Sequence, residues 1–575
     1  MRLSKWQGFL VRLRNLYVNY SYWGQYAPLF DMKKIYLLFH TIRHLKPVQL
    51  IDRIRRRFKK TDLKFSSTPS LRLKKQPWED KELIQSSYIS ENKYRFLNLE
   101  GDVGSWNDSD KSKLWLYNLH YFDDLNAIGS SNRRDACVSL INSWIQENPP
   151  LFGNGWEPYP LSLRIVNWIK FFHKHEYDVD NSRQSLYLQA HVLRQNLEYH
   201  LLGNHLFANA KALVFAGCYF KGEAADEWLE KGLEIIDAEV SEQILHDGGN
   251  FELSPMYHNI ILSDMLDLYN LANTYAIQNF EPRKHQWMLV IQKMLDYSES
   301  LQHPDGEVSF FNDSAMGIAA NYQSLSQYAA ALGIPYVINY KSKAGEAITY
   351  SHYQDSGYIV AQSENYKVIM DVARIGPDYI PGHAHADTLS FEVSIFGQRV
   401  FVNTGTGEYG LSQERLRQRK TAAHNTVEID GLDSSEVWSG FRVAKRAYPS
   451  ETSIEESSSG LRVSCSHDGY MRLKGKVIHH REWLFESNQI DIIDSLSGTY
   501  KQANAYLHLH PNIQAFVDGK IVKLVLGCGK EVIMESSSPI KVENAIWCPE
   551  FGKMVPTIKL CIPVFKSRLT VSLRF

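Results

Sequence analysis

The sequence predicts a multidomain chain in which a helical toroid or solenoid is followed by an antiparallel β-sandwich. From about residue 30 to residue 340, apolar residues recur at spacings of three and four, which is typical of amphipathic helices. From about residue 350 onward the hydrophobic period becomes two, which is typical of strands with one buried face. A chain of 575 residues is also too long for a single hydrophobic core, so separate domains are expected.

The helical part consists of apolar runs separated by breakers. The clearest helical runs are residues 187–200, 209–220, 260–276 and 287–301. Proline and glycine interrupt the pattern at residues 149–150, 153–155, 247–250 and 304–306. No strict sequence period marks a repeat, so the toroid is inferred from many consecutive helices joined by loops.

The β part continues to the last residue. The clearest strand patterns are residues 358–360, 367–370, 389–395, 399–402 and 426–429. Glycine, serine and asparagine turns separate these and later strands, which favours an antiparallel sandwich. We therefore divide the chain into an N-terminal helical extension (1–100), the toroid (101–345) and the β-sandwich (346–575).

Composition limits the class of ligand. A net charge of −1 gives no general attraction to nucleic acid, so no nucleic-acid partner is expected. Six scattered cysteines lack C-x-x-C spacing, so neither a zinc ribbon nor a disulfide framework is predicted. The chain has 13 Trp and 32 Tyr, a content that suits stacking against sugars, although aromatic residues also fill helical cores.

Targeting signals are weak. No apolar run reaches the length of a transmembrane helix, so none is expected. Residues 1–30 lack the continuous apolar core and the cleavage site of a signal peptide, which predicts a cytoplasmic or peripheral location, with a periplasmic one as the alternative. The basic run at 52–60 is most often a solvated helix face and less often a site for an anionic membrane or polysaccharide. The oligomeric state is not predicted.

A histidine cluster is the most informative feature of the β part. If residues 383–387 form a strand, His383, His385 and Asp387 share one face. Asn403 and His424 follow within about forty residues, in segments that also read as strand. This pattern indicates a catalytic or metal-binding site, with a hydrogen-bonded polar cluster as the alternative.

The helical part contains a matching constellation. Asn204 and His205, both candidate catalytic residues, lie between two helical runs, and Tyr257 follows a glycine-rich turn. An amide, a phenol and imidazoles suit β-elimination at a uronic acid, which needs a carboxylate binder, a base and an acid. Asn204 is the candidate carboxylate binder, His383 the base, and Tyr257 the acid or the group that serves both roles.

Several segments together resemble the heparinase II/III superfamily of polysaccharide lyases. The matching segments, in family order, are residues 116–123, 156–164, 203–212, 247–258, 305–314, 383–387 and 424–427. The resemblance implies an (α/α) toroid followed by an antiparallel β-sandwich, and an acidic polysaccharide or oligosaccharide as substrate. It places the carboxylate-binding amide at Asn204, the catalytic tyrosine at Tyr257 and the catalytic histidine at His383. It adds His424 as a further active-site or metal-associated histidine.

The resemblance also implies a structural metal in the sandwich. Its ligands would be His385, Asn403 and His424, where relatives normally have Asp at the middle position. A neutral amide is a poorer zinc ligand than a carboxylate, so we expect this site to be empty or weakly occupied, with a structural Zn or Ca as the alternative. No cofactor is required for the chemistry.

Five further residues are candidate substrate contacts. Arg415 and Arg419 belong to a basic run with Arg417 that would share one face if extended, and guanidinium groups suit sugar carboxylates or sulfates. A solvated loop is the alternative. Arg164 and Trp156 lie in an aromatic-rich stretch and could line the toroid. Glu252 could line the cleft or pair with a histidine.

Two other functions compete with a lyase. The spacing of His383, His385 and Asp387 is similar to the metal motif of metallo-β-lactamase-like hydrolases, but Thr388 replaces its last histidine. The second alternative is a non-catalytic glycan-binding or glycan-modifying component of surface-polysaccharide biosynthesis. Because Asn204, Tyr257 and His383 are all present, we favour a lyase, linked to bacterial surface-polysaccharide metabolism.

Overall fold

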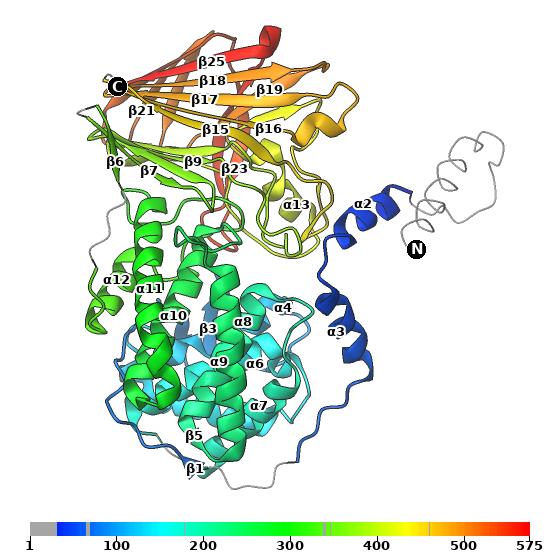
Figure 1. The fold of residues 1–575 in the computed structure, drawn as a ribbon, viewed down its shortest axis with the longest axis vertical. Coiled ribbons are helices and arrows are strands. Elements are labelled where there is room, and N and C mark those ends of the chain that lie inside the picture. The colour runs from blue at the N-terminus through cyan, green and yellow to red at the C-terminus, as the bar shows by residue number, and fades with distance from the viewer. Residues whose placement is uncertain (1–31, 65–69, 178, 337–340, 346, 459) are drawn as a thin grey trace, which may run out of the picture.

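The computed structural model describes residues 32–64, 70–177, 179–336, 341–345, 347–458 and 460–575. The helical and β halves lie one above the other in Figure 1. This arrangement confirms the predicted order of a helical region followed by antiparallel sheets, and it excludes the interleaved strands and helices of a metallo-β-lactamase-like fold. Within the described ranges, no helix is long and apolar enough to cross a bilayer.

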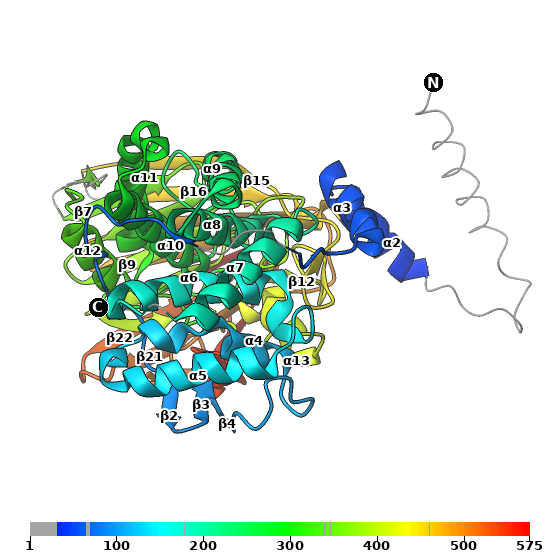
Figure 2. The ribbon, with the colours of Figure 1, turned by 90° about the horizontal axis from the view of Figure 1, so that it is seen from below.

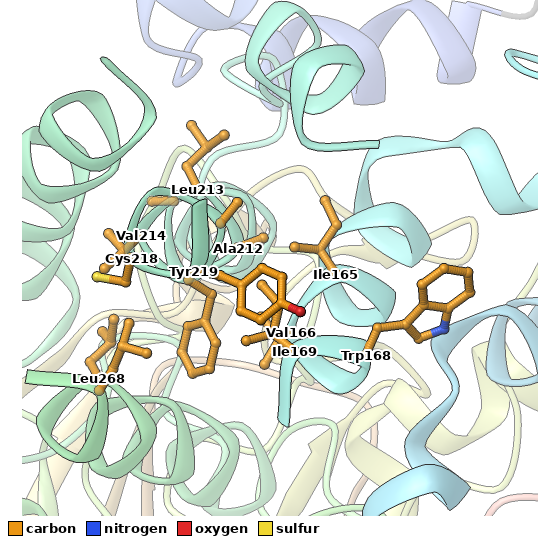
Figure 3. Packing of buried hydrophobic residues seen from close by; sticks show 14 of the residues in the cluster. Ile165, Val166, Trp168, Ile169, Ala212, Leu213, Val214, Cys218, Tyr219 and Leu268 are labelled. Carbon is orange, nitrogen blue, oxygen red and sulfur yellow. The ribbon is translucent and has the colours of Figure 1, made fainter. Parts of the chain in front are cut away.

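The helical half is built around α8, whose residues are buried except His205. Its helices are α4 (Lys113–Tyr121), α5 (Arg134–Glu147), α6 (Pro158–His175), α7 (Asp180–Gln195), α8 (Gly203–Tyr219), α9 (Glu223–Gln243), α10 (Pro255–Tyr275), α11 (Glu281–Leu301) and α12 (Tyr322–Ala331). Figure 3 shows side chains of α6, α8 and α10 meeting in this core. Gly217 and Gly232 let α8 and α9 approach closely, since a Cβ on Gly217 would lie 2.6 Å from the Leu229 nitrogen.

The β half contains three larger sheets, all antiparallel. A six-stranded sheet has the order β11-β10-β9-β8-β7-β6, an eight-stranded sheet the order β15-β16-β17-β18-β25-β22-β21-β20, and a four-stranded sheet the order β12-β19-β24-β23. One apolar core lies between the sheets and includes Phe391, Trp483 and Leu560. These sheets therefore pack face to face, as a sandwich requires.

The strands of these three sheets have the following bounds: β6 (Ser342–Ala344), β7 (Ile348–Tyr353), β8 (Tyr358–Gln362), β9 (Tyr366–Asp371), β10 (Phe391–Ile395), β11 (Gln398–Phe401), β12 (Val427–Ile429), β15 (Pro449–Glu456), β16 (Leu461–His467), β17 (Ile478–Glu486), β18 (Gln489–Ser497), β19 (Ala503–His508), β20 (Gln514–Asp518), β21 (Ile521–Val525), β22 (Glu531–Ser536), β23 (Lys541–Trp547), β24 (Val555–Pro563) and β25 (Arg568–Arg574). A separate pair, β13 (Val437–Trp438) and β14 (Arg442–Val443), follows α13 (Gln413–Arg419).

The N-terminal extension is only partly helical. Helices α2 (Met32–Ile42) and α3 (Pro47–Phe58) are followed by β1 (Ser70–Leu71), β2 (Tyr88–Ser90), β3 (Lys93–Phe96) and β4 (Leu99–Asp102). The prediction of helix up to residue 100 is therefore wrong for 70–102; residues 1–31 lie outside the described residues. Asn92 and Asn98 adopt positive φ in the turns between β2, β3 and β4, a conformation that asparagine tolerates. Figure 2 shows this small sheet beside α4 and α5.

Contacts between the two halves bring loops of the β half onto the helical half. The Tyr358 hydroxyl donates to the Leu253 carbonyl (2.8 Å), and the Asp313 amide donates to the His383 carbonyl (3.0 Å). The Met316 amide donates to the Pro549 carbonyl (2.7 Å). These hydrogen bonds fix the β9–β10 loop, which carries His383, against the segments that surround Tyr257.

Candidate active site

Tyr257 and His383 meet at the junction of the two halves. Tyr257 lies in the first turn of α10, which Ser254 caps by accepting a hydrogen bond from the Tyr257 amide. The two ring centroids are 4.0 Å apart at an interplanar angle of 35°. The His383 side chain is 14% exposed, so solvent reaches the pair.

The segment that carries His383 is a loop, so the expected strand at 383–387 is wrong. Strand β10 begins only at Phe391. Side chains rather than a β-ladder anchor the loop: the His385 amide donates to Asn312 Oδ1 (2.9 Å), and Arg419 Nε donates to the Ala384 carbonyl (3.1 Å). The alternation His-Ala-His-Ala-Asp imitates the period of a strand but is not hydrogen-bonded as one.

Asp313 organises the histidines from the helical side. Its buried carboxylate accepts hydrogen bonds from His383 Nδ1 (2.9 Å), His385 Nε2 (2.8 Å) and both terminal nitrogens of Arg415. Burial raises the pKa of Asp313, but Arg415 and the two histidines outweigh it and hold that pKa well below its usual range. An ionised carboxylate only accepts, so the hydrogen bond to Asp313 places a proton on His383 Nδ1, and in the neutral imidazole Nε2 then carries the lone pair.

Glu252 and Asn204 lie on the other side of His383. Glu252 Oε2 is 3.6 Å from His383 Nε2, and the Glu252 carboxylate accepts a hydrogen bond from the Asn204 backbone. Gly203 (φ +56°) fits this turn, because a Cβ there would be 3.2 Å from Glu252 Oε1. In the described part of the chain the Asn204 side-chain amide has no hydrogen-bond partner, so it is free to bind a ligand.

Tyr409 completes the group and was not predicted. Its hydroxyl oxygen is 3.0 Å from that of Tyr257, and the Arg415 guanidinium lies 4.9 Å from its ring centroid. Burial raises the pKa of both Tyr257 and Tyr409 well above the usual range, so both phenols are neutral at pH 7. A single tyrosine in a loop after β11 carries no sequence signal that would have identified it.

His205 lies farther along α8, in contact with a different pair. Its ring centroid is 4.4 Å from that of Tyr159, and its Nδ1 is 3.3 Å from Glu198 Oε1. Burial lowers the pKa of His205, but the Glu198 carboxylate outweighs it and raises the net value. Its catalytic role stays a prediction, as does the role of Glu252 in substrate binding.

Four of the predicted substrate contacts are buried and bonded inside the protein. Arg164 is fully buried, and its guanidinium donates to Gln189 and to the carbonyls of His120 and Gly155. Trp156 is buried and donates to the Asn148 carbonyl. The polar groups of both side chains are bonded inside the protein, and a role in substrate binding stays a prediction for both.

The arginines of residues 415–419 were expected on an extended segment but lie on helix α13. Arg415 is fully buried against Asp313, and Arg419 is fully buried against the Ala384 carbonyl. Their predicted contact with a substrate stays a prediction. Both arginines hold the loop that carries His383 and His385 in position.

A second polar cluster lies behind the site. Ligand atoms of His385, Asp387 and His424 fall within 4.8 Å of one another, and all three residues are buried. His385 Nδ1 and both ring nitrogens of His424 have no hydrogen-bond partner. Buried polar atoms without a partner lower the stability of the fold unless a ligand binds them. His424 is buried, and its predicted active-site or metal-associated role stays a prediction.

Asn403, the third predicted ligand, is hydrogen-bonded to neighbouring loops. Its Oδ1 accepts a hydrogen bond from the Asn425 amide (3.1 Å), and its Nδ2 donates to Ser390 Oγ (3.4 Å). The amide is therefore engaged in holding neighbouring loops together. Asp387 adds a carboxylate beside the two histidines, and the ligand role of Asn403 stays a prediction.

Comparisons with known proteins agree with this architecture. The family described as Heparinase II/III N-terminus matches residues 46–336, and the one described as Heparinase II/III-like, C-terminal matches residues 349–575. The chain belongs to the heparinase II/III-like family. The resemblance to this family inferred from the sequence motifs is thereby confirmed.

Individual relatives of this heparinase II/III-like chain are distant. A heparin-sulfate lyase of Bacteroides stercoris is 25% identical over 322 residues, covering 53% of this chain and 45% of that protein. A heparin-sulfate lyase of Pedobacter heparinus is 24% identical, covering 56% of this chain and 49% of that protein. The chain thus spans about half the length of the curated relatives it matches.

Solved structures show the same fold. The crystal structure of a heparinase III is similar with a TM-score of 0.65 and 18% identity, covering 82% of this chain and 79% of that one. The heparan sulfate lyase HepC from Pedobacter heparinus is similar with a TM-score of 0.53 and 18% identity, covering 84% and 81%. At this identity the likeness supports the fold alone.

Proposed function

We propose that this heparinase II/III-like protein cleaves a uronic-acid-containing polysaccharide by β-elimination. The observation that carries the proposal is the contact between Tyr257 and His383, with ring centroids 4.0 Å apart. Around it lie a free amide on Asn204, an ionised Asp313 and a neutral Tyr409. This set offers a base, an acid and a carboxylate binder within one site.

In the reaction, the C5 proton of the uronic acid leaves as a proton, and its electron pair forms the C4–C5 double bond. The bond between C4 and the glycosidic oxygen breaks, and that oxygen takes a proton. His383 Nε2 is the base, because Nδ1 is committed to Asp313. Glu252 Oε2, 3.6 Å away, is placed to stabilise the imidazolium that forms.

Tyr257 is the acid in this proposal. Burial keeps its phenol protonated, so a proton is available for the departing glycosidic oxygen. The Tyr409 hydroxyl, 3.0 Å from that of Tyr257, can bond the phenolate that is left. The proton that His383 takes up returns to the Tyr257 phenolate after product release, directly or through solvent, and the two rings are in contact.

Asn204 binds the substrate carboxylate in this proposal. It lies in the first turn of α8, where the helix dipole also favours an anion. We expect Asn204→Ala to lower kcat/KM about 10²–10³-fold, by analogy with loss of one oxyanion-hole donor. A methyl-esterified substrate is the matched test, because it has no carboxylate charge to neutralise. Equal losses on the free acid and the ester would contradict this role.

We also propose that His385, Asp387 and His424 hold a structural zinc ion. The unpartnered imidazole nitrogens fit a metal, and two nitrogen donors with one carboxylate suit zinc better than calcium, which prefers oxygen ligands. Bound there, the ion would tie the β9–β10 loop to the segment before β12. The reaction itself is assigned to other residues.

Elemental analysis of protein purified without chelator tests the metal site. We expect about one zinc per chain, as in closed structural sites. Asp387→Ala should abolish zinc retention and lower the melting temperature, whereas Asn403→Ala should retain the zinc. Zinc lost through Asn403→Ala and kept in Asp387→Ala would show that the ligand assignment is wrong.

A further inference from the structure

Helix α3 presents its apolar side chains to solvent and its polar ones to the protein. Ile51 and Ile54 are each 63% exposed, and Phe58 is 81% exposed. The buried residues of this helix are Gln49 and Asp52. An ordinary surface helix has the opposite arrangement, with its apolar stripe against the core.

The polar face of α3 is bonded to the protein, so this orientation is fixed. Asp52 Oδ2 accepts a hydrogen bond from the His200 amide (3.1 Å), and Arg56 Nη2 donates to the Leu197 carbonyl (3.0 Å). Gln49 Nε2 donates to the Tyr379 carbonyl (3.3 Å), on the same loop as His383. The helix therefore lies beside the candidate active site with its apolar face turned outward.

Helix α2 is exposed on the same flank of the molecule. Its exposed large apolar residues are Met32, Ile35, Tyr36, Phe39 and Ile42. The Thr41 hydroxyl donates to the Val443 carbonyl (3.1 Å), and Trp438 Nε1 donates to Thr41 Oγ1 (3.1 Å), so α2 docks on the β half. Figures 1 and 2 both show α2 and α3 next to each other at one side of the two halves.

The apolar faces are surrounded by positive charge. In α3, Arg55 and Arg57 lie to either side of the line formed by Ile51, Ile54 and Phe58. The basic residues of 32–60 are Lys33, Lys34, Arg43, Lys46, Arg53, Arg55, Arg56, Arg57, Lys59 and Lys60. Partial burial and then Arg55 and Arg56 lower the pKa of Lys59, which reflects crowded positive charge.

Acidic residues are nearly absent from the same part of the sequence. Residues 1–60 contain only Asp31 and Asp52 as acids, and Asp52 is buried. In a two-fold symmetric dimer, the same surface of both copies forms the interface. A second copy of the chain would therefore bring one basic face against another. Residues 1–30 have basic residues and no acid, so they offer no complementary charge either.

We propose that the exposed faces of α2 and α3 bind the surface of a bilayer that contains anionic lipids. Amphipathic helices with lysine and arginine beside the apolar face lie in the headgroup region of membranes, and this binding needs no spanning helix. The apolar side chains enter the boundary between headgroups and acyl chains. The arginines and lysines pair with lipid phosphates.

Vesicle co-sedimentation of the full chain tests this proposal. We expect binding to phosphatidylcholine vesicles that contain phosphatidylglycerol, weaker binding to phosphatidylcholine alone, and weakening by salt. Ile54→Ser combined with Phe58→Ser should lower the partition coefficient about tenfold or more. Arg53→Gln combined with Arg57→Gln should selectively weaken binding to the anionic vesicles.

The control replaces two exposed phenylalanines in another part of the molecule. Phe516 and Phe565, in the β half, are 56% and 57% exposed, and Phe516→Ser combined with Phe565→Ser should bind vesicles like the wild type. No vesicle binding by the wild type, or equal binding by all variants, would overturn the proposal. The proposal would also be overturned if the wild type formed a dimer that the α3 variant does not form, and if the wild type bound no vesicles.

Discussion

Tyr257→Phe is expected to lower turnover about 10²–10⁴-fold, the usual contribution of a general acid, while leaving the fold intact. The change removes only the hydroxyl, so the ring keeps its contact with His383. Without the hydroxyl, the departing glycosidic oxygen has no proton donor in the position of the acid. Initial rates on a cleaved uronate glycan and a thermal melt measure the two parts of this prediction.

The control for Tyr257 is a phenol that bonds inside the fold. Tyr358 is fully buried and donates its hydroxyl to the Leu253 carbonyl, so Tyr358→Phe should cost stability and leave the rate of the folded protein near that of the wild type. If Tyr257→Phe stays within about threefold of the wild-type rate on any cleaved glycan, Tyr257 is not the acid.

His383→Ala is expected to lower turnover by a similar factor, about 10²–10⁴-fold, because it removes the base. The fold should persist, since Arg415 and His385 still bond the Asp313 carboxylate that the variant exposes. Added imidazole should restore part of the activity by occupying the space of the missing ring.

His285 provides the histidine control. It is exposed on α11, away from Asp313, and His285→Ala should keep full activity and show no response to imidazole. If the His383→Ala variant kept near-normal turnover, the base would have to be another group. Full loss of activity without imidazole rescue would leave His383 as a positioning residue rather than the base.

Much of the fold was predictable because hydrophobic period is a local signal. The change from a period of three and four to a period of two near residue 345 separates the helical and β halves. The same signal misled at residues 383–387, where alternating histidine and alanine belong to a loop anchored by Asn312 and Arg419. It also missed the short strands of 88–102, whose pairing depends on the turns at Asn92 and Asn98.

The site was predictable only in part, because the tertiary fold decides which side chains contact one another. Motifs identified Tyr257 and His383, which the structure brings together from opposite halves. The role of Asp313 follows from three partners distant in sequence, and that of Tyr409 from one hydroxyl contact. Arginine in an aromatic stretch suggested a sugar contact, and the sequence could not show that backbone carbonyls bond the guanidinium of Arg164 in the core.

The most direct test of the proposed chemistry is a screen of uronic-acid-containing polysaccharides in water labelled with oxygen-18. β-Elimination creates a conjugated double bond and adds no water, so we expect ultraviolet-absorbing oligosaccharides without the label. Asn204→Ala, Tyr257→Phe and His383→Ala should each suppress that product. Saturated products that carry the label would indicate hydrolysis and contradict the account. Binding of an acidic glycan without any cleavage would instead make the protein a non-catalytic glycan-binding component.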